Sequence, residues 1–418
     1  MNGSLPSGAW ETEKSVASLI NHFRGLGGGF EGRAACNPGT PLKIIFSLLS
    51  RPYALGARGR RALYQWGWLQ VKCLPAPVVS VGNLTVGGTG KTPLVACLAR
   101  MFQEQGKKVA VLSRGYGGRA KGVTCLSDGR EIYHQPPEVG EEAFWLARTL
   151  PGVMVYTAPS RYEAGMVAWR QQRPDIFLLD DGFQHFQLHR DLDLVLLDAE
   201  APFGNGLLLP AGPLREPAAT LAAAQVLILT RFAPERHRPV LEAIKKAWPD
   251  KTVLTAAIAP TTARRFPAGE AHPLEALGGL PLFAFAGLAR PQVFAQTLAQ
   301  MGVGLKGQHY FPDHYDYTPT DLQALIREAQ SQGATALITT SKDWARLGER
   351  WPGELPLWVL EVEAKLLQPL PDSIMDHLLA RSTGETPVPP AFPLSRQPPL
   401  LTPSRGLGGE FEGRAGEP

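Results

Sequence analysis

A glycine-rich loop between an apolar run and a helix-compatible run constrains the fold of this chain more than any other feature. Residues 77–81 predict a buried strand, and residues 93–105 predict a helix. Strand, loop and helix in this order are the context of a phosphate-binding loop, because glycines let backbone N–H groups face a phosphate and the helix N-terminus adds its positive dipole. The residues predicted to bind nucleotide are Thr85, Val86, Gly87, Gly88, Thr89, Gly90, Lys91 and Thr92.

Two residues of this loop have predicted chemical roles. Lys91 would reach the β- and γ-phosphates and counts as a catalytic residue, and the Thr92 hydroxyl would ligate Mg²⁺. Thr85 occupies the first position of the loop, which is usually glycine. A glycine-rich turn before a helix can also be purely structural. The glycines together with the Lys-Thr pair favour a nucleotide site, with ATP and Mg²⁺ as the predicted cofactors.

A second apolar run ends in two carboxylates. Residues 176–179 are followed by Asp180 and Asp181, as expected of a buried parallel strand whose C-terminal end opens on a ligand crevice. We expect one of the two aspartates to hold Mg²⁺, directly or through water. A turn or a helix cap is the alternative explanation of the pair, and the upstream loop favours the metal site.

The alternation of apolar and helix-compatible runs predicts an α/β fold with a doubly wound, mostly parallel sheet. After Ala257 the pattern becomes mixed and indicates a second, smaller α/β domain. We predict a nucleotide-binding core over 73–257 and a smaller substrate or catalytic domain over 258–381, with the active site in the cleft between them. The predicted strands are 108–112, 153–156, 176–179, 194–197, 226–230, 252–256, 282–286 and 336–340, and the predicted helices are 141–149, 162–172, 239–248, 291–301 and 319–332.

Residues 41–72 form a basic and aromatic segment. No acidic residue occurs between Glu31 and Glu104, and the apolar run at 44–49 is far shorter than the roughly 20 residues that a spanning helix needs. We expect two amphipathic helices, one on each side of Pro52, that lie in a membrane interface. Each basic side chain near an anionic leaflet contributes about 1 kcal/mol. A helix packed on the core with a solvated basic face is the alternative. The basic residues are Lys43, Arg51, Arg58, Arg60, Arg61 and Lys72, and the aromatic ones include Tyr64, Trp66 and Trp68.

The two ends of the chain share a glycine-rich sequence. Residues 24–34 recur as 405–415 with one difference, and 382–404 is rich in proline. Such runs bury too little apolar surface to offset chain entropy. We expect 1–40 and 382–418 to be disordered tails outside the chemistry, and docking of the two copies on each other is the alternative. The net charge of +4 is mild and indicates no nucleic-acid partner.

Seven blocks of sequence, taken in order, resemble the tetraacyldisaccharide 4'-kinase (lipid A kinase) family. The blocks span residues 80–93, 113–118, 180–185, 209–217, 285–294, 310–318 and 339–347. The resemblance implies an ATP- and Mg²⁺-dependent kinase that phosphorylates the 4'-hydroxyl of a tetraacylated glucosamine disaccharide 1-phosphate in lipid A biosynthesis. It further implies a peripheral, monotopic enzyme on the cytoplasmic face of the inner membrane. Its partners would be the acylated disaccharide lipid and that membrane surface, with no obligate protein partner.

The resemblance also implies a catalytic dyad of an acidic residue and a histidine. The matching positions are Glu141, which opens a predicted helix, and His314, in the sequence Phe-Pro-Asp-His. Glu141 stands where the family usually has aspartate, so its side chain is one methylene longer, and Glu142 is the fallback. Without the resemblance, Glu141 could be a first-turn carboxylate that complements the helix dipole, and His314 could order a loop among acidic neighbours.

Four more residues are candidates for substrate binding or an accessory role: Arg114, His185, Arg215 and Glu216. Arg114 follows a strand end, and Arg215 and Glu216 lie in a proline-flanked loop suited to a bidentate phosphate contact. Lys342 and Asp343 belong to the last block, and their chemistry suggests no role.

Two other functions fit parts of the pattern. One is a P-loop switch or partitioning ATPase, whose signature extra lysine would occupy position 86, which is valine here. The other is a soluble small-molecule kinase, in which 41–72 would pack on the core.

Overall fold

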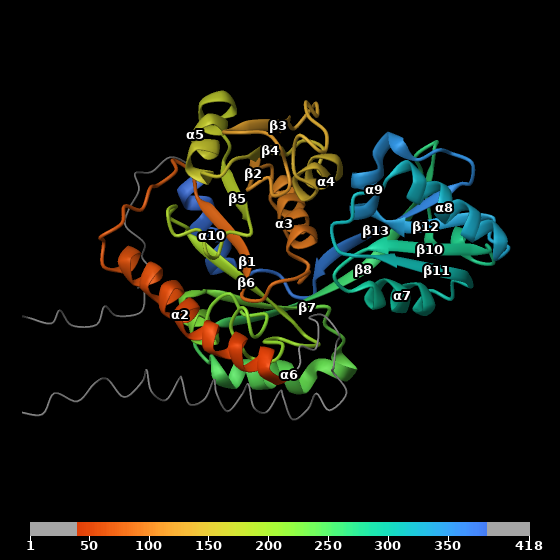
Figure 1. Ribbon diagram of the computed structural model, residues 1–418. Helices are drawn as coiled ribbons and strands as arrows, with labels where there is room; N and C mark the ends of the chain where they lie inside the picture. The colour runs from red at the N-terminus through yellow and green to blue at the C-terminus, as the bar shows by residue number, and fades with distance from the viewer. Residues whose placement is uncertain (1–39, 383–418) are drawn as a thin grey trace, which may run out of the picture. The chain divides into compact units, whose positions relative to one another are not determined.

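One sheet of 13 strands runs through residues 40–382, the part of the chain that this computed structural model describes (Figure 1). The predicted disordered tails lie outside this range, apart from the residues at its two ends. The strand order is β11-β10-β12-β13-β8-β7-β6-β1-β5-β2-β4-β3, with β9 paired to β8. The strands are β1 (Val78–Asn83), β2 (Val109–Ser113), β3 (Thr124–Asp128), β4 (Met154–Thr157), β5 (Ile176–Asp180), β6 (Leu192–Asp198), β7 (Val226–Thr230), β8 (Thr252–Phe266), β9 (Glu270–His272), β10 (Leu282–Gly287), β11 (Leu305–Phe311), β12 (Ala336–Thr340) and β13 (Leu357–Leu366).

The nucleotide-binding half has the predicted doubly wound, mostly parallel sheet. β1 pairs in parallel with both β5 and β6, and β3 is the antiparallel strand at the edge. Val81 of β1 lies opposite Asp180 of β5. Because parallel strands end at the same edge of a sheet, the loop after β1 and the acidic pair after β5 emerge side by side.

Helices cover both faces of this half. Leu194 and Leu196 of β6 pack in one cluster with α3, α4 and α10, whereas the alternate residues Val195 and Leu197 pack in another cluster with α6. α5 packs over β2 and β5 in a further cluster. The helices are α2 (Thr40–Gln65), α3 (Lys91–Glu104), α4 (Glu141–Thr149), α5 (Arg161–Gln172), α6 (Pro234–Ala247), α7 (Pro291–Gln300), α8 (Pro319–Ser331), α9 (Ser341–Leu347) and α10 (Asp372–Ser382).

β8 links the two halves of the sheet, and it is much longer than the predicted strand 252–256. Its first residues pair in parallel with β7, and its later residues pair antiparallel with β13 (Figure 1). The predicted boundary between 257 and 258 therefore falls inside one strand, and the described residues belong to one compact unit. β10, β11, β12 and β13 pair in parallel and form the second, smaller α/β half. After β13 the chain returns to the first half of the sheet, where α10 packs on the core. The division into two domains stays a prediction.

The segment 41–72 differs from the prediction of two helices. α2 is one helix that runs through Pro52 and ends at Gln65. A proline removes one hydrogen bond and can bend a helix without ending it. Ser50, two residues earlier, donates its hydroxyl to the carbonyls of Phe46 (2.8 Å) and Leu208 (3.1 Å), which ties the helix to the rest of the fold.

Large apolar side chains remain exposed on α2 and in the segment after it. They are Leu48, Leu49, Tyr53, Leu55, Trp66, Trp68, Leu69 and Val71. None of the helices within 40–382 has the length and apolar character needed to span a membrane.

Candidate active site

A buried asparagine organises the glycine-rich loop. Asn83, the last residue of β1, donates to the Thr85 carbonyl (2.7 Å) and to Thr89 Oγ1 (2.9 Å), and it accepts from Lys91 Nζ (3.1 Å). Gly90 has a φ of 86°, which an L-residue rarely adopts, and α3 begins directly after it. Sequence reasoning missed Asn83, although a buried amide at a strand end is a recognisable signal.

The outer side of the loop is held by the end of β7. Thr230 donates its hydroxyl to the Thr89 carbonyl (2.8 Å), and Arg231 Nη1 donates to the Gly88 carbonyl (2.9 Å). Both bonds hold loop carbonyls on the side of β7. The N–H groups of Val86 and Thr89 donate to the carbonyls of Pro213 (2.8 Å) and Gly87 (3.1 Å), so a phosphate would face the other N–H groups of the loop.

The two adjacent aspartates have different surroundings. Asp180 is buried, and burial and then the charge of Glu142 raise its pKa to about 7. Burial also opposes ionisation of Asp181, but Lys91 and Arg215 outweigh it and lower the pKa of that carboxyl. Arg215 Nη1 contacts both oxygens of Asp181 (3.0 and 2.7 Å), and Lys91 Nζ lies 3.6 Å from its Oδ1. The carboxylate of Asp181 is thus paired with two protein cations, whereas Asp180 Oδ1 has no hydrogen-bond partner within the described residues.

The residues present fit a magnesium ion that arrives with a nucleotide. Residues 40–382 contain no group of three or more His, Cys, Asp or Glu side chains that could hold a metal alone. A Mg²⁺ ion bound to a nucleotide needs fewer protein ligands, because phosphate oxygens and water molecules complete its coordination shell. Asp180 Oδ1 is buried without a hydrogen-bond partner within the described residues, and Thr92 lies in the first turn of α3. These two residues could supply the protein ligands.

Glu141 and His314 come together from distant segments. Glu141 is the first residue of α4, and His314 lies between β11 and α8 with a φ of 58°. The distance from His314 Nδ1 to Glu141 Oε2 is 3.4 Å. The hydrogen bond to Glu141 raises the pKa of His314. Burial opposes ionisation of Glu141, but His314 and then Arg346 lower the pKa of its carboxyl.

The neighbouring Glu142, the fallback residue, has a different partner. Lys342 Nζ donates to Glu142 Oε1 (2.9 Å). Burial opposes ionisation of Glu142, whereas Lys342 and then Lys91 lower the pKa of its carboxyl. The electrostatic interaction with Lys91 connects the start of α4 to the glycine-rich loop.

His185 lies among arginines. Its Nε2 is buried without a hydrogen-bond partner within residues 40–382, and burial followed by Arg161 lowers the pKa of the ring to about 4. Arg190, Arg60 and Arg114 act in the same direction. Arg161 is itself buried, and burial followed by Arg114 lowers its pKa. Sequence reasoning missed Arg161, which looks like an ordinary first-turn residue of a helix. The cluster is suited to an anionic ligand.

Arg215 and Glu216 face different partners. Whereas Arg215 binds Asp181, Glu216 is buried and accepts from Arg61 Nη2 of α2 (2.9 Å). The Arg61 guanidinium also lies 4.9 Å from the ring centroid of Phe186. The proline-flanked loop therefore connects α2 to the acidic pair.

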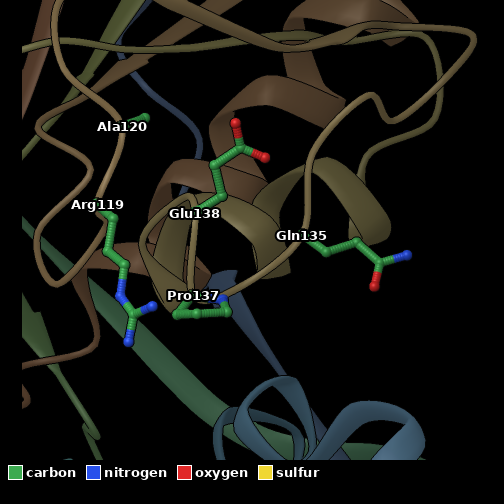
Figure 2. A pocket seen from close by; sticks show the side chains of 5 residues that line it. All are labelled: Arg119, Ala120, Gln135, Pro137 and Glu138. Atoms are coloured by element: carbon green, nitrogen blue, oxygen red, sulfur yellow. The ribbon is translucent and has the colours of Figure 1, made fainter.

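Two adjoining pockets lie near the start of α4, and Arg114 lines the smaller one. The smaller, of about 150 Å³, is lined by Arg114 and shares Ala120 and Glu138 with a larger, open one of about 470 Å³. Figure 2 shows the larger pocket, where the side chains of Arg119 and Glu138 point away from each other. Its remaining lining residues are Gln135 and Pro137.

Comparisons with known proteins point to one family. The family model described as tetraacyldisaccharide-1-P 4'-kinase matches residues 42–381. The tetraacyldisaccharide 4'-kinase of Geobacter metallireducens is 41% identical over 337 residues, which cover 80% of this chain and 98% of that protein. The enzyme of the same name from Geobacter sulfurreducens is 42% identical over 365 residues, which cover 87% of this chain and 100% of that protein.

A solved structure is also similar. The crystal structure of the "apo" form of LpxK from Aquifex aeolicus in complex with ATP has a TM-score of 0.65 and 31% sequence identity to this chain. The similarity covers 82% of this chain and 99% of that one.

Proposed function

The chain belongs to the tetraacyldisaccharide-1-phosphate 4'-kinase family, and on that premise we propose that it transfers the γ-phosphate of ATP to the 4'-hydroxyl of a tetraacylated disaccharide 1-phosphate. One observation carries the proposal. The start of α4 bears both Glu141, which pairs with His314, and Glu142, which interacts electrostatically with Lys91. In the proposal, the phosphate-binding lysine and the proton acceptor therefore belong to one site.

The glycine-rich loop supplies the nucleotide end of the reaction. In the proposal, the loop N–H groups and Lys91 hold the β- and γ-phosphates, and Asn83 keeps the ammonium in place. Thr92 and Asp180 would hold Mg²⁺, which neutralises charge on the phosphates when bound. Arg215 keeps Asp181 ionised beside Lys91.

Glu141 and His314 supply the acceptor end. A lowered pKa keeps the Glu141 carboxylate ionised at neutral pH, so it can take the proton of the 4'-hydroxyl. The hydroxyl oxygen then forms a bond to the γ-phosphorus, and the bond from that phosphorus to the β-phosphate bridging oxygen breaks to release ADP. His314 would orient the carboxylate and share the proton.

The arginine cluster would bind the phosphate that the lipid already carries. Arg114, Arg161 and His185 lie together, and His185 has a ring nitrogen free to bond an anion. A dianionic sugar phosphate suits such a site because arginine donates in a planar fork. The polar pocket of about 150 Å³ that Arg114 lines would take only a small part of the head group, such as the phosphate itself.

We further propose that α2 and residues 66–71 lie in the membrane interface, at the cytoplasmic face of the inner membrane. The exposed leucines and tryptophans could insert among lipid chains, and the basic residues could contact anionic head groups. The Arg61–Glu216 pair would then bring the active-site loop close to the bilayer where the substrate resides.

Transfer of labelled γ-phosphate to the isolated lipid tests the function. Purified protein is incubated with ATP, Mg²⁺ and tetraacyldisaccharide 1-phosphate, and lipid-borne label and free phosphate are measured. The proposal predicts Mg²⁺-dependent label on the lipid. Free phosphate without labelled lipid would indicate a switch or partitioning ATPase, and label on soluble glucosamine derivatives in place of the lipid would indicate a small-molecule kinase.

A further inference from the structure

The last sequence block, at 339–347, contains a buried arginine for which the proposed function gives no role. Arg346 lies on α9, and its side chain is 3% exposed. A buried guanidinium keeps its charge and is costly unless its donors are satisfied. The hydrogen-bond partners of Arg346 therefore indicate its role.

Arg346 contacts both members of the Glu141–His314 pair. Its Nε donates to Glu141 Oε2 (2.6 Å), and its Nη2 lies 3.2 Å from His314 Nδ1. The third nitrogen, Nη1, donates to the Gly287 carbonyl (2.9 Å) and to Asp343 Oδ1 (3.1 Å). Because all three nitrogens are engaged, the plane of the guanidinium is fixed relative to both side chains.

The anchor of this guanidinium is itself rigid. Asp343 is fully buried and accepts from the Tyr317 hydroxyl (2.8 Å), the Gly287 N–H (3.0 Å) and the Thr340 hydroxyl (2.6 Å). Tyr317 is also fully buried. Asp343 therefore holds Arg346 against β10 and the loop that carries His314.

We propose that Arg346 is a positioning residue that holds Glu141 and His314 in register for proton transfer, an inference that rests on the proposed function. Two partners face His314 Nδ1: a neutral ring accepts from Arg346 there, whereas a protonated ring donates to Glu141. Arg346 thus orients the ring and opposes its protonation, whereas the hydrogen bond to Glu141 favours protonation. Arg346 Nε also occupies Oε2, one of the two oxygens of the Glu141 carboxylate, through a hydrogen bond.

Lysine cannot replace arginine in this role. A single ammonium has no planar fork and cannot span Glu141, His314 and Asp343 together. Arg346→Lys should therefore behave like Arg346→Gln in turnover, although it keeps the charge.

The control is an arginine that also pairs with a glutamate through Nε but lies outside the site, with a side chain that is 37% exposed. Arg264 Nε lies 2.7 Å from Glu361 Oε1, between β8 and β13. Arg346→Gln should lower kcat by about 10- to 100-fold, as loss of an orienting contact does, while KM for ATP stays within about threefold. Arg264→Gln should change neither.

A double-mutant cycle separates positioning from general support of the fold. If Arg346 acts through the dyad, Arg346→Gln should cost less than about threefold in a protein that already carries His314→Ala. A normal kcat for Arg346→Gln, or a full multiplicative loss in the double variant, would overturn the inference. If Arg346→Gln does not fold by circular dichroism, Arg346→Lys takes its place in the cycle, with the same two outcomes.

Failure of the proposed function gives a different result. In that case the unaltered protein itself transfers no phosphate to the disaccharide lipid, whatever residue 346 is. If the unaltered protein is active and Glu141→Gln is also fully active, the dyad fails, and Arg346 loses its role with it.

Discussion

The glycine-rich loop and the Glu141–His314 pair form opposite ends of one proposed site, yet the chain builds them in different ways. The loop is a continuous stretch, and its main organiser, Asn83, lies within eight residues of Lys91. The acceptor end joins α4, the loop before α8 and α9, and its ion pair from Arg346 to Glu141 spans 205 positions.

This difference has a physical consequence. Hydrogen bonds from Asn83 and from the end of β7, together with a helix N-terminus, preorganise the nucleotide end. All of these belong to the first half of the sheet, so the geometry of the loop depends little on the second half. The acceptor end depends on the packing of the second half against α4. Variants of the loop should therefore affect nucleotide binding, and variants of the acceptor end should affect transfer.

The largest effect is expected from Lys91→Ala. It removes the charge that faces the phosphates while the loop backbone remains, so transfer should fall by at least about 1000-fold without a change in circular dichroism. Lys245→Ala, an exposed lysine on α6, is the control. Near-normal lipid phosphorylation by Lys91→Ala would refute the phosphate-loop assignment.

The acceptor end should give the next largest effect. Glu141→Gln and His314→Ala should each lower turnover by roughly 10²–10⁴-fold, as expected of a general base. The double variant should be little worse than either one, because residues that act as a unit are not additive. Glu141→Asp should retain substantial activity. Normal turnover of Glu141→Gln would instead mark the carboxylate as a helix-start charge.

The sequence predicts local features well and distant partners poorly. The strands at 226–230 and 336–340 and the helix at 141–149 have the predicted bounds, because their apolar spacing and flanking residues are local. Asp180 is also where a strand end predicts it.

The misses have a shared physical cause. Pro52 bends or weakens a helix locally, but the sequence does not show whether flanking residues continue it, as they do in α2. Arg346 and Arg161 have no local signature, because their roles come from side chains that the fold brings to them. The dyad itself was found through the family resemblance and not through spacing.

A moderate effect is expected at the membrane segment. Trp66 and Trp68 are 63% and 75% exposed, so serine at both positions removes apolar surface available to lipid. Binding to anionic vesicles should weaken by about tenfold or more. Tyr133→Ser, at an exposed aromatic residue elsewhere, should leave binding unchanged. Undiminished vesicle binding by the double serine variant would favour packing of this segment on the protein.

The smallest effect is a shift in one titration. The hydrogen bond to Glu141 raises the pKa of His314, Asp313 acts in the same direction, and burial and Arg346 oppose them. Glu141→Gln removes the main cause, so the pKa of His314 should fall, and Arg346→Gln should raise it. The stabilisation from the Glu141–His314 pair is present where His314 is protonated and Glu141 is ionised. It is lost as pH rises through the pKa of His314 in the folded protein, and also as pH falls through the pKa of Glu141. NMR titration of the ring protons measures both shifts, and an unchanged value in Glu141→Gln would mean that the two side chains do not interact in solution.

Binding and transfer measured on the same variant test the division of labour most directly. For Glu141→Gln, the ATP dissociation constant is measured by calorimetry, and the transfer rate is measured in a single turnover at saturating ATP and lipid. The account predicts a dissociation constant within about threefold of the unaltered protein, and a transfer rate at least about 100-fold lower. A variant that binds ATP much more weakly but transfers phosphate at the normal rate once saturated would contradict it.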